Sequence, residues 1–216
     1  MKLSDQEKVR IRELAARVEA QTGVQVLAVV TGKSDIYPEV PWKAFSLGAA
    51  MAALALATGS AFELGRVSTS PLVWGTAVLG AGMISALAGI FLQPVARCFL
   101  GKERAEEEAR QYAQSLFLER ILGRERSRKA ILLLASQLER RAAVLADTGI
   151  TGRIPETEFE KIASAMDAVL AGGSAPDALA GGLLDVEKLL LRHGFARASA
   201  GDDIPEEFLE REGPNS

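Results

Sequence analysis

Two long uncharged runs lie next to each other near the middle of this chain, between segments in which charged and apolar residues alternate. Residues 45–62 and 71–96 contain no Asp, Glu, Lys or Arg, and only a short polar segment separates them. A helix rises about 1.5 Å per residue, so either run is long enough to cross a hydrocarbon core of about 30 Å. We therefore predict a transmembrane helical hairpin over residues 44–100, with spans at about 44–62 and 71–96.

The alternative is a hairpin buried inside a soluble protein. The remainder of the chain is small for burying a hairpin that is apolar on all sides. Trp42 and Trp74 lie near ends of the runs, where indole rings favour the headgroup layer. Small residues four positions apart are typical of closely packed spanning helices, but they also fit ordinary spanning composition; the pairs are Gly48 with Ala52, Gly82 with Ala86, and Ser85 with Gly89.

The basic residues around the runs predict the orientation of the hairpin. Arg66 is the basic residue of the connecting segment, whereas the flanks carry Lys33, Lys43, Arg97, Lys102, Arg104 and Arg110. This bias places the flanking soluble parts in the cytoplasm, on the inner side of a bacterial plasma membrane. The N-terminus lacks a basic segment followed by an apolar core, so we expect no signal peptide.

The first soluble segment, residues 1–43, predicts a helix and a strand. Ser4 with Glu7 forms a capping-box pattern that opens a helix, and Gly23 closes it. Residues 24–31 are apolar and β-branched, as in a buried strand, and a loop at 32–41 follows.

The second soluble segment, residues 101–197, predicts three helices and two strands. An amphipathic helix at 102–122 precedes strands at 129–135 and 141–146, whose short connection indicates an antiparallel pair. The strand at 129–135 should lie parallel to the first strand. Pro155 and Ser174 open two further amphipathic helices, and residues 198–216 read as an acidic flexible tail. The pattern thus predicts an α/β domain, with helices on a small mixed sheet.

Composition adds mainly exclusions. The chain has 216 residues and a net charge of −3, which gives no reason to expect a nucleic-acid partner. One Cys and one His make a zinc site unlikely on spacing grounds, and His193 before Gly194 suits a helix end.

Residues 128–150 resemble the central signature of the TPM domain family, which includes thylakoid photosystem-repair proteins and many bacterial membrane proteins. The matching positions are Glu19, Thr22 and Gly23 in the first helix, Ala109 and Phe117 in the later helix, and Ser136, Glu139, Arg140, Asp147, Gly149 and Ile150 around the paired strands. The resemblance implies a three-layer α/β fold with about four strands, interrupted here after the first strand by the hairpin. It also implies divalent-cation binding or acid phosphatase activity, which have been linked to similar proteins.

Three carboxylates are candidate ligands for calcium or magnesium. Asp147 ends a strand, Glu19 ends the first helix and Asp35 follows the first strand, so convergent loops would supply the hard oxygen ligands that these cations prefer. Arg140 is a candidate partner for a phosphate or a carboxylate. The alternatives are an Asx turn at Asp147 and solvated or ion-paired roles for the other three.

Three functions remain open at this level. The first is a membrane-anchored module that binds a divalent cation and membrane-protein partners in assembly or quality control. The second is a metal-dependent acid phosphatase, although no nucleophile–base pair or phosphate loop stands out. The third is a non-catalytic protein whose hairpin self-associates through its small residues.

Overall fold

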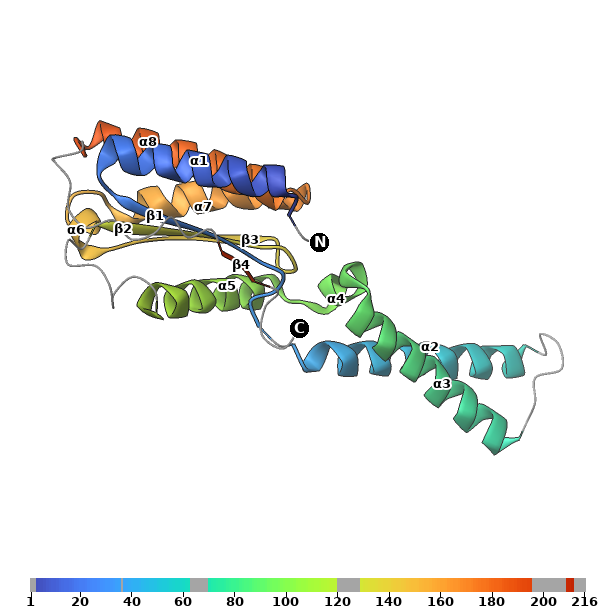
Figure 1. The fold of residues 1–216 in the computed structure, drawn as a ribbon. Helices are drawn as coiled ribbons and strands as arrows, with labels where there is room; N and C mark the ends of the chain where they lie inside the picture. The colour runs from blue at the N-terminus through green and yellow to red at the C-terminus, as the bar shows by residue number, and fades with distance from the viewer. Residues whose placement is uncertain (1–2, 36, 63–69, 120–128, 196–208, 212–216) are drawn as a thin grey trace. The chain divides into compact units, whose positions relative to one another are not determined.

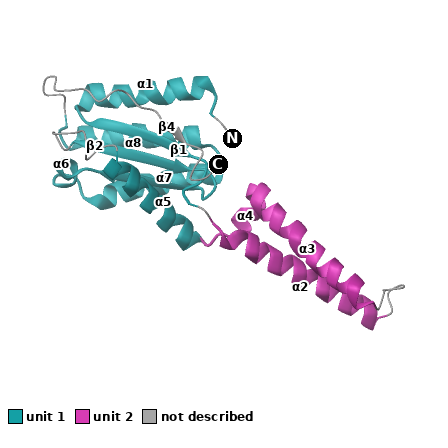
Figure 2. Cartoon of the chain, turned by 60° about the horizontal axis from the view of Figure 1, so that its bottom comes forward, with its two compact units in different colours: residues 1–36, 102–216 teal, residues 37–101 magenta. Residues whose placement is uncertain are grey.

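The computed structural model describes residues 3–35, 37–62, 70–119, 129–195 and 209–211. These residues form two compact units (Figure 2): an α/β unit of residues 1–36 and 102–216, and a hairpin unit of residues 37–101. Each unit is described by itself.

The α/β unit is built on a mixed sheet with the strand order β3-β2-β1-β4. β1 (Gln25–Thr31) pairs in parallel with β2 (Ala130–Ser136), which pairs antiparallel with β3 (Arg141–Ala146). Both pairings confirm the predictions from the sequence. The short β4 (Leu209–Arg211) pairs in parallel with the end of β1, within the segment predicted as a flexible tail. The rest of that tail, 198–208 and 212–216, lies outside the described residues.

Helices cover both faces of this sheet (Figure 1). α1 (Asp5–Thr22), α7 (Glu156–Ala171) and α8 (Ala175–Arg192) lie on one face, and α5 (Lys102–Phe117) lies on the other. The strand pattern explains this layering, because successive side chains of a strand point to opposite faces. Ile131 and Leu133 enter the larger core under the three helices, whereas Leu132 and Leu134 enter the smaller core under α5.

The helix ends follow their sequence signals. Ser4 and Glu7 form the predicted capping box, and Gly23 closes α1 in the left-handed conformation. Pro155 precedes α7, and the Ser174 side chain accepts a hydrogen bond from the backbone N–H of Asp177 at the start of α8. The predicted end of the α5 segment at Gly123 lies outside the described residues. α6 (Thr148–Thr151), a single turn, was not predicted.

The hairpin unit contains α2 (Glu39–Ala61), α3 (Pro71–Phe91) and the short α4 (Gln93–Phe99). α2 begins before the predicted position 44, so the predicted loop at 32–41 is too long. The second uncharged run is also not one helix to residue 96, because Leu92 is extended and α4 starts anew. Pro94 accounts for this break, since its nitrogen cannot donate the helical hydrogen bond to the carbonyl of Ile90.

Small residues allow α2 and α3 to pack closely. A methyl group on Gly48 would lie 2.8 Å from the carbonyl oxygen of Ala81 and would collide with the Ser85 side chain. A methyl group on Gly82 would lie 2.7 Å from the ring of Phe45. These small residues are therefore used inside the chain, between its own two helices, which removes the observation that favoured their use in self-association.

Candidate functional site

Glu19, the first predicted ligand, closes the outer edge of β1. Its Oε1 accepts a 2.8 Å hydrogen bond from the backbone N–H of Val26. The N–H of Gln25 points the other way, to the carbonyl of Lys129 next to β2, so Val26 faces away from β2. Glu19 thus satisfies a backbone donor on the side of β1 away from β2, outside the stretch Val29–Thr31 that pairs with β4.

Asp147, the second predicted ligand, caps α6. Its Oδ1 accepts hydrogen bonds from the backbone N–H of Thr148 at 2.5 Å and from the Thr148 hydroxyl at 3.1 Å. Its own N–H donates to the carbonyl of Ala130 at the start of β2, which continues the β2–β3 ladder by one position. The side chain is 5% exposed. Asp147 is therefore a buried helix cap, whereas the alternative from the sequence was an Asx turn.

Asp35, the third predicted ligand, lies beyond the other end of β1. Its carboxylate is 3.8 Å from the Arg104 guanidinium of α5, and both side chains are partly exposed. β1 has seven residues, so its two ends are about 20 Å apart at roughly 3.3 Å per residue. Asp35 is therefore far from Glu19 and Asp147, which lie at the other end of the sheet.

The three carboxylates do not converge. Asp147 is in line with β3, two strand positions or about 10 Å from β1, whereas Glu19 lies beyond the opposite edge of β1. No group of three His, Cys, Asp or Glu side chains suited to a metal ion occurs among the described residues. Strand order and direction place each loop at a different corner of the sheet, so the structure does not bring the three carboxylates together.

Arg140, the fourth candidate, lies in the turn between β2 and β3. It has a positive φ of 52°, and its Nη1 donates to the carbonyl of Ala171 at the end of α7 at 2.8 Å. A guanidinium at the last carbonyls of a helix suits the helix dipole. Its Nε is buried and has no hydrogen-bond partner among the described residues. The contacts described for Arg140 thus secure the turn to α7.

A buried carboxylate that the candidate set omitted lies at this end of the sheet. Glu139 is 7% exposed and accepts hydrogen bonds from the backbone N–H of Ser34 at 2.7 Å and from the hydroxyl of Ser136. It therefore ties the loop after β1 to the turn after β2. The signal was present in the sequence as the Ser136-x-x-Glu139 spacing, but only the fold shows that its partner is Ser34.

This polar cluster lies where the two parallel strands end. Thr31 closes the first loop by donating from its hydroxyl to the carbonyl of Lys33 at 2.8 Å, and the Ser34 hydroxyl is buried without a partner among the described residues. The carboxyl ends of parallel strands are the usual position of binding sites in α/β sheets. Here the carboxylate is engaged by backbone and hydroxyl donors, so the cluster serves to join two loops.

A second omitted carboxylate, Asp167 of α7, closes the far edge of the sheet. Its Oδ1 accepts from the backbone N–H of Ala142 at 2.6 Å, and its Oδ2 lies 2.6 Å from the Arg141 guanidinium. Glu19 and Asp167 thus satisfy donors on β1 and on β3. Asp167 thus covers a donor on the open edge of β3, whereas Glu19 covers a donor of β1 outside the stretch Val29–Thr31 that pairs with β4.

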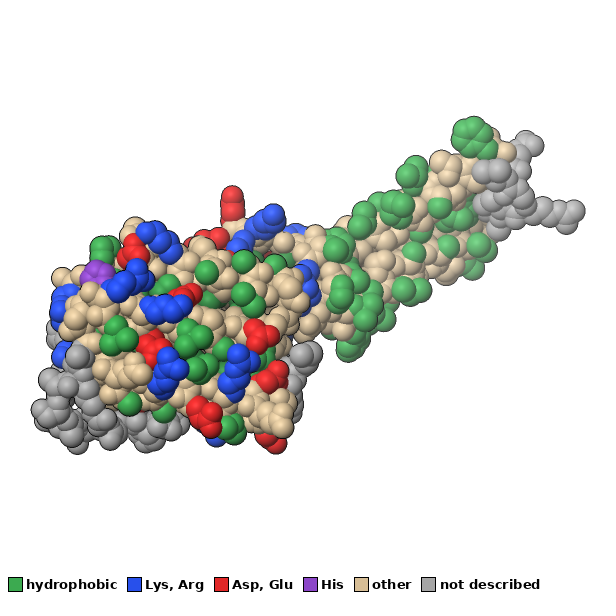
Figure 3. Space-filling model, turned by 90° about the horizontal axis from the view of Figure 1, so that it is seen from above, with side chains coloured by type: hydrophobic (Ala, Val, Ile, Leu, Met, Phe, Trp, Pro, Cys, Tyr) green, Lys and Arg blue, Asp and Glu red, His purple; other side chains and the backbone are tan. Residues whose placement is uncertain are grey.

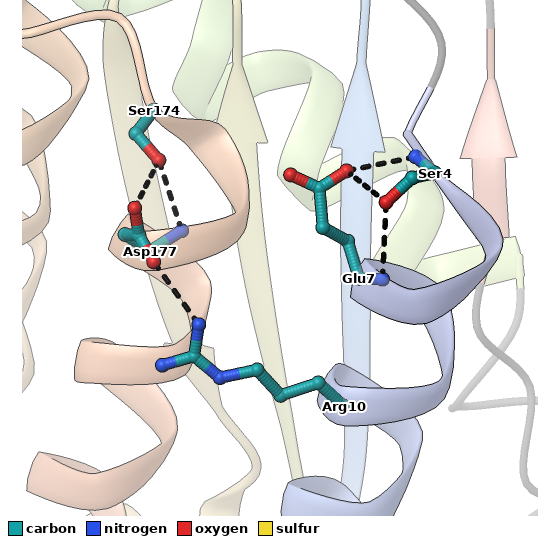
Figure 4. A network of polar contacts seen from close by, with 5 residues as sticks. All are labelled: Ser4, Glu7, Arg10, Ser174 and Asp177. Atoms are coloured by element: carbon teal, nitrogen blue, oxygen red, sulfur yellow. Dashed lines mark hydrogen bonds and ion pairs between the residues drawn. The ribbon is translucent and has the colours of Figure 1, made fainter.

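Helix ends on the surface carry the clearest electrostatic effects. The beginnings of α1 and α8 lie side by side, where Arg10 contacts Asp177 at 3.2 Å (Figure 4). The hydrogen bond from the Ser174 hydroxyl, with a smaller contribution from Arg10, lowers the pKa of Asp177. Further along these helices, Arg17 pairs with the buried Glu187 at 2.6 Å, and this hydrogen bond raises the pKa of Arg17.

The surface of the hairpin unit is its most distinctive chemical feature. Of the most apolar 18-residue stretch in each helix, 6% in α2 and 11% in α3 are buried inside the protein. Met51 is 59% exposed, Leu54 58% and Ile84 70%. Figure 3 shows hydrophobic side chains along the hairpin, whereas charged side chains gather on the α/β unit. Both helices are long and apolar enough to cross a membrane.

Comparisons with known proteins support the fold alone. No family model matches the chain, and no curated protein matches it. The chain is similar to the NMR structure of the BA42 protein from the psychrophilic bacterium Bizionia argentinensis, with a TM-score of 0.57. The match covers 97% of this chain and 96% of that one at 10% sequence identity. At 10% identity this likeness concerns the fold, and it gives no information about the activity of this chain.

Proposed function

We propose that this chain is a membrane-anchored interaction module, held in the bilayer by the α2–α3 hairpin and carrying a TPM-like α/β domain. The observation that carries the proposal is the exposed apolar surface of both long helices. Soluble proteins commonly expose single apolar side chains, but they rarely expose a large contiguous apolar surface. The large apolar side chains of these two successive helices form such a surface. A bilayer removes that surface from water without any further protein.

The hairpin has the length and composition that the bilayer requires. α2 has 23 residues and α3 has 21, so each spans about 30 Å or slightly more. Their backbone hydrogen bonds are satisfied within each helix, as a hydrocarbon environment demands. The hydroxyls of Thr58 and Thr76 donate to carbonyls one turn earlier, at Leu54 and Leu72, so these polar atoms are also satisfied.

The distribution of basic residues supports a cytoplasmic position for the α/β unit. The described charged residues of the hairpin unit are Glu39, Lys43 and Arg97, all outside the uncharged cores of the helices. Lys102, Arg104 and Arg110 follow in α5. Cationic residues on one flank oppose translocation of that flank, so the proposal places both termini in the cytoplasm.

The α/β unit is proposed to act through protein contacts. The four residues suggested by the sequence each have a structural partner: Val26 for Glu19, Arg104 for Asp35, Ala171 for Arg140 and Thr148 for Asp147. These contacts account for the four residues as structural groups, without a catalytic role. Hydrogen bonds that fix the strand edges and the loops give the unit a rigid surface, which suits contacts with other membrane proteins in assembly or quality control.

Cysteine labelling tests the anchoring and the orientation together. Cys98 is the natural cysteine of the chain and is exposed on α4. In intact cells a membrane-impermeant maleimide should leave Cys98 unlabelled and should label it after permeabilisation. A Ser70→Cys variant in a Cys98→Ser background should already be labelled in intact cells. Release of the chain from membranes by alkaline carbonate would overturn the anchoring. Labelling of Cys98 from outside in intact cells would overturn the orientation.

The interaction role needs a separate test. The full chain, solubilised in mild detergent after cross-linking in cells, should retain specific membrane proteins. A chain with the hairpin intact and Glu139→Ala, which loosens the two loops, should retain fewer of them than a matched Glu160→Ala variant on the exposed surface of α7. Identical recovery with both variants, or no partner with the wild-type chain, would contradict the proposal.

A further inference from the structure

The end of the hairpin unit that contains the start of α2 and the short helix α4 has contacts and side chains that crossing a membrane does not require. The beginning of α2 and the end of α4 are joined there, because the Lys43 ammonium donates to the carbonyl of Phe99, 3.3 Å away. α4 is separate from α3, since Leu92 is extended between them. The chain thus folds a short second helix back against the base of α2, at the limit of the uncharged region.

The ends of α2 and α3 and the short α4 carry both aromatic and basic residues. Trp42 is 71% exposed and Phe91 is 76% exposed, and the Trp42 ring contacts that of Phe45 edge to face. Exposed rings at the end of an apolar span are typical of the headgroup layer. Lys43 of α2 precedes the first uncharged run in the sequence, and Arg97 of α4 follows the second.

We infer that this end of the hairpin, formed by Trp42 and Lys43 of α2 and by Arg97 of α4, binds the phosphates of anionic phospholipids. The inference rests on the proposed membrane anchoring and names the lipid class that the anchor prefers. The Lys43 ammonium has three N–H donors and the Arg97 guanidinium has five. Lys43 donates to the carbonyl of Phe99 and Arg97 donates to Gln93 at 3.5 Å, and both cations are of the kind that forms charge-assisted hydrogen bonds with phosphate oxygens.

The charge balance favours an anionic headgroup over a zwitterionic one. Glu39, one turn before Lys43, is the carboxylate among the described residues of the hairpin unit, against the two cations. A phosphatidylcholine headgroup brings its own cation to the same layer, whereas phosphatidylglycerol brings only the negative phosphate. Guanidinium and ammonium groups bind phosphate oxygens through charge-assisted hydrogen bonds, and attraction between basic residues and anionic lipid falls off within a Debye length.

The test is native mass spectrometry of the full chain in detergent, with phosphatidylglycerol or phosphatidylcholine of the same acyl chains added in equal amounts. The wild-type chain should retain at least three times more phosphatidylglycerol than phosphatidylcholine. A Lys43→Gln, Arg97→Gln double variant should lose that preference. A Lys161→Gln, Lys188→Gln variant removes two positive charges from exposed helix positions of the α/β unit and should keep it.

Each result decides a different point. Equal retention of the two lipids by the wild-type chain overturns the inference, and so does an equal loss in both double variants, which would mean that total charge alone matters. Carbonate extraction of the same variants separates this from the anchoring itself. If the chains remain in the membrane fraction but show no lipid preference, the result contradicts the headgroup site and leaves the anchoring supported. If carbonate releases the chains, the result contradicts the anchoring itself.

Discussion

The carboxylate of Glu139 accepts a hydrogen bond from the backbone N–H of Ser34, 2.7 Å away and 105 positions earlier in the chain. The same carboxylate accepts from Ser136 in its own turn. This single side chain therefore holds together two loops that leave neighbouring parallel strands. One of those loops, after β1, is the last part of the α/β unit before the hairpin unit begins.

Replacement of Glu139 by Ala should destabilise the α/β unit. The change leaves the buried N–H of Ser34 and the hydroxyl of Ser136 without their acceptor, and a buried donor without an acceptor costs about 1–3 kcal/mol. Circular dichroism of the full chain in detergent, followed through denaturant, measures the loss. Glu160→Ala at an exposed position of α7 is the control and should stay within about 0.5 kcal/mol of wild type. Equal stability of the two variants would show that the Glu139 contacts contribute nothing net.

The two helices of the hairpin should separate when a methyl group is added at Gly48. A methyl group there would overlap Ser85 and approach the carbonyl of Ala81 to 2.8 Å, so the Gly48→Ala variant must move one helix. Overpacking of this kind costs about 1–3 kcal/mol. Gly80→Ala is the matched control, because nothing lies within 4 Å of the position its methyl group would take.

The measurement for this pair is disulfide formation between cysteines placed at Ala44 and Gly89, in a Cys98→Ser background. A Cβ at Gly89 would lie 3.3 Å from that of Ala44, close to the separation in a disulfide. Gly48→Ala should slow the cross-link, whereas Gly80→Ala should leave its rate unchanged. A rate that is the same in both variants would contradict the close α2–α3 packing.

Substitutions at Asp147 should affect stability more than calcium or magnesium binding. Asp147→Ala removes the cap of α6 and should cost about 1 kcal/mol, whereas Asp147→Asn keeps an acceptor oxygen and should cost much less. Calorimetric titration with either cation should give the same heat for wild type, Asp147→Asn and Asp35→Asn, because the two carboxylates lie at opposite ends of the sheet. A binding heat that disappears only in Asp147→Asn would restore a cation site at this strand end.

Acid should weaken the junction between α1 and α8 through Asp177. The hydrogen bond from Ser174 and the nearby Arg10 lower the folded-state pKa of Asp177, so the folded state holds the charged form more strongly than the unfolded state. The stabilisation is therefore complete above the ordinary carboxyl pKa of about 3.9 and disappears as the pH falls through the lowered value. The effect is small because both side chains of the Arg10 pair are 59% exposed.

A comparison of wild type with Asp177→Asn measures this contribution. The difference in unfolding midpoint between the two should be constant from pH 7 to about pH 5 and should shrink as the pH falls below the ordinary carboxyl pKa of about 3.9. Asp185→Asn, whose partner Lys188 lies on the same helix, tests the general effect of a lost surface charge. If the Asp177 difference grew as the pH fell, the sign of its pKa shift would be wrong.

Local signals in the sequence determined most of the elements of this protein. The capping box at Ser4, the left-handed Gly23 and the apolar runs of β1 and β2 all concern residues that are neighbours in the chain, so their patterns predict the local structure directly. The two uncharged runs predicted two long apolar helices for the same reason. The break at Leu92 was also readable from Pro94, but the absence of charge obscured it.

The tertiary structure alone decided what the candidate site residues do. Glu19, Asp35 and Asp147 each follow or end an element, and in the sequence that position looks the same whichever end of the sheet the residue occupies. Strand order and direction assign the three to different corners, and partners far away in the chain, such as Ser34 for Glu139 and Ala142 for Asp167, complete the picture. The sequence by itself determined the elements and the apolar hairpin, because both depend on short-range periodicity. The roles of the polar residues depend on long-range pairing, which only the folded sheet specifies.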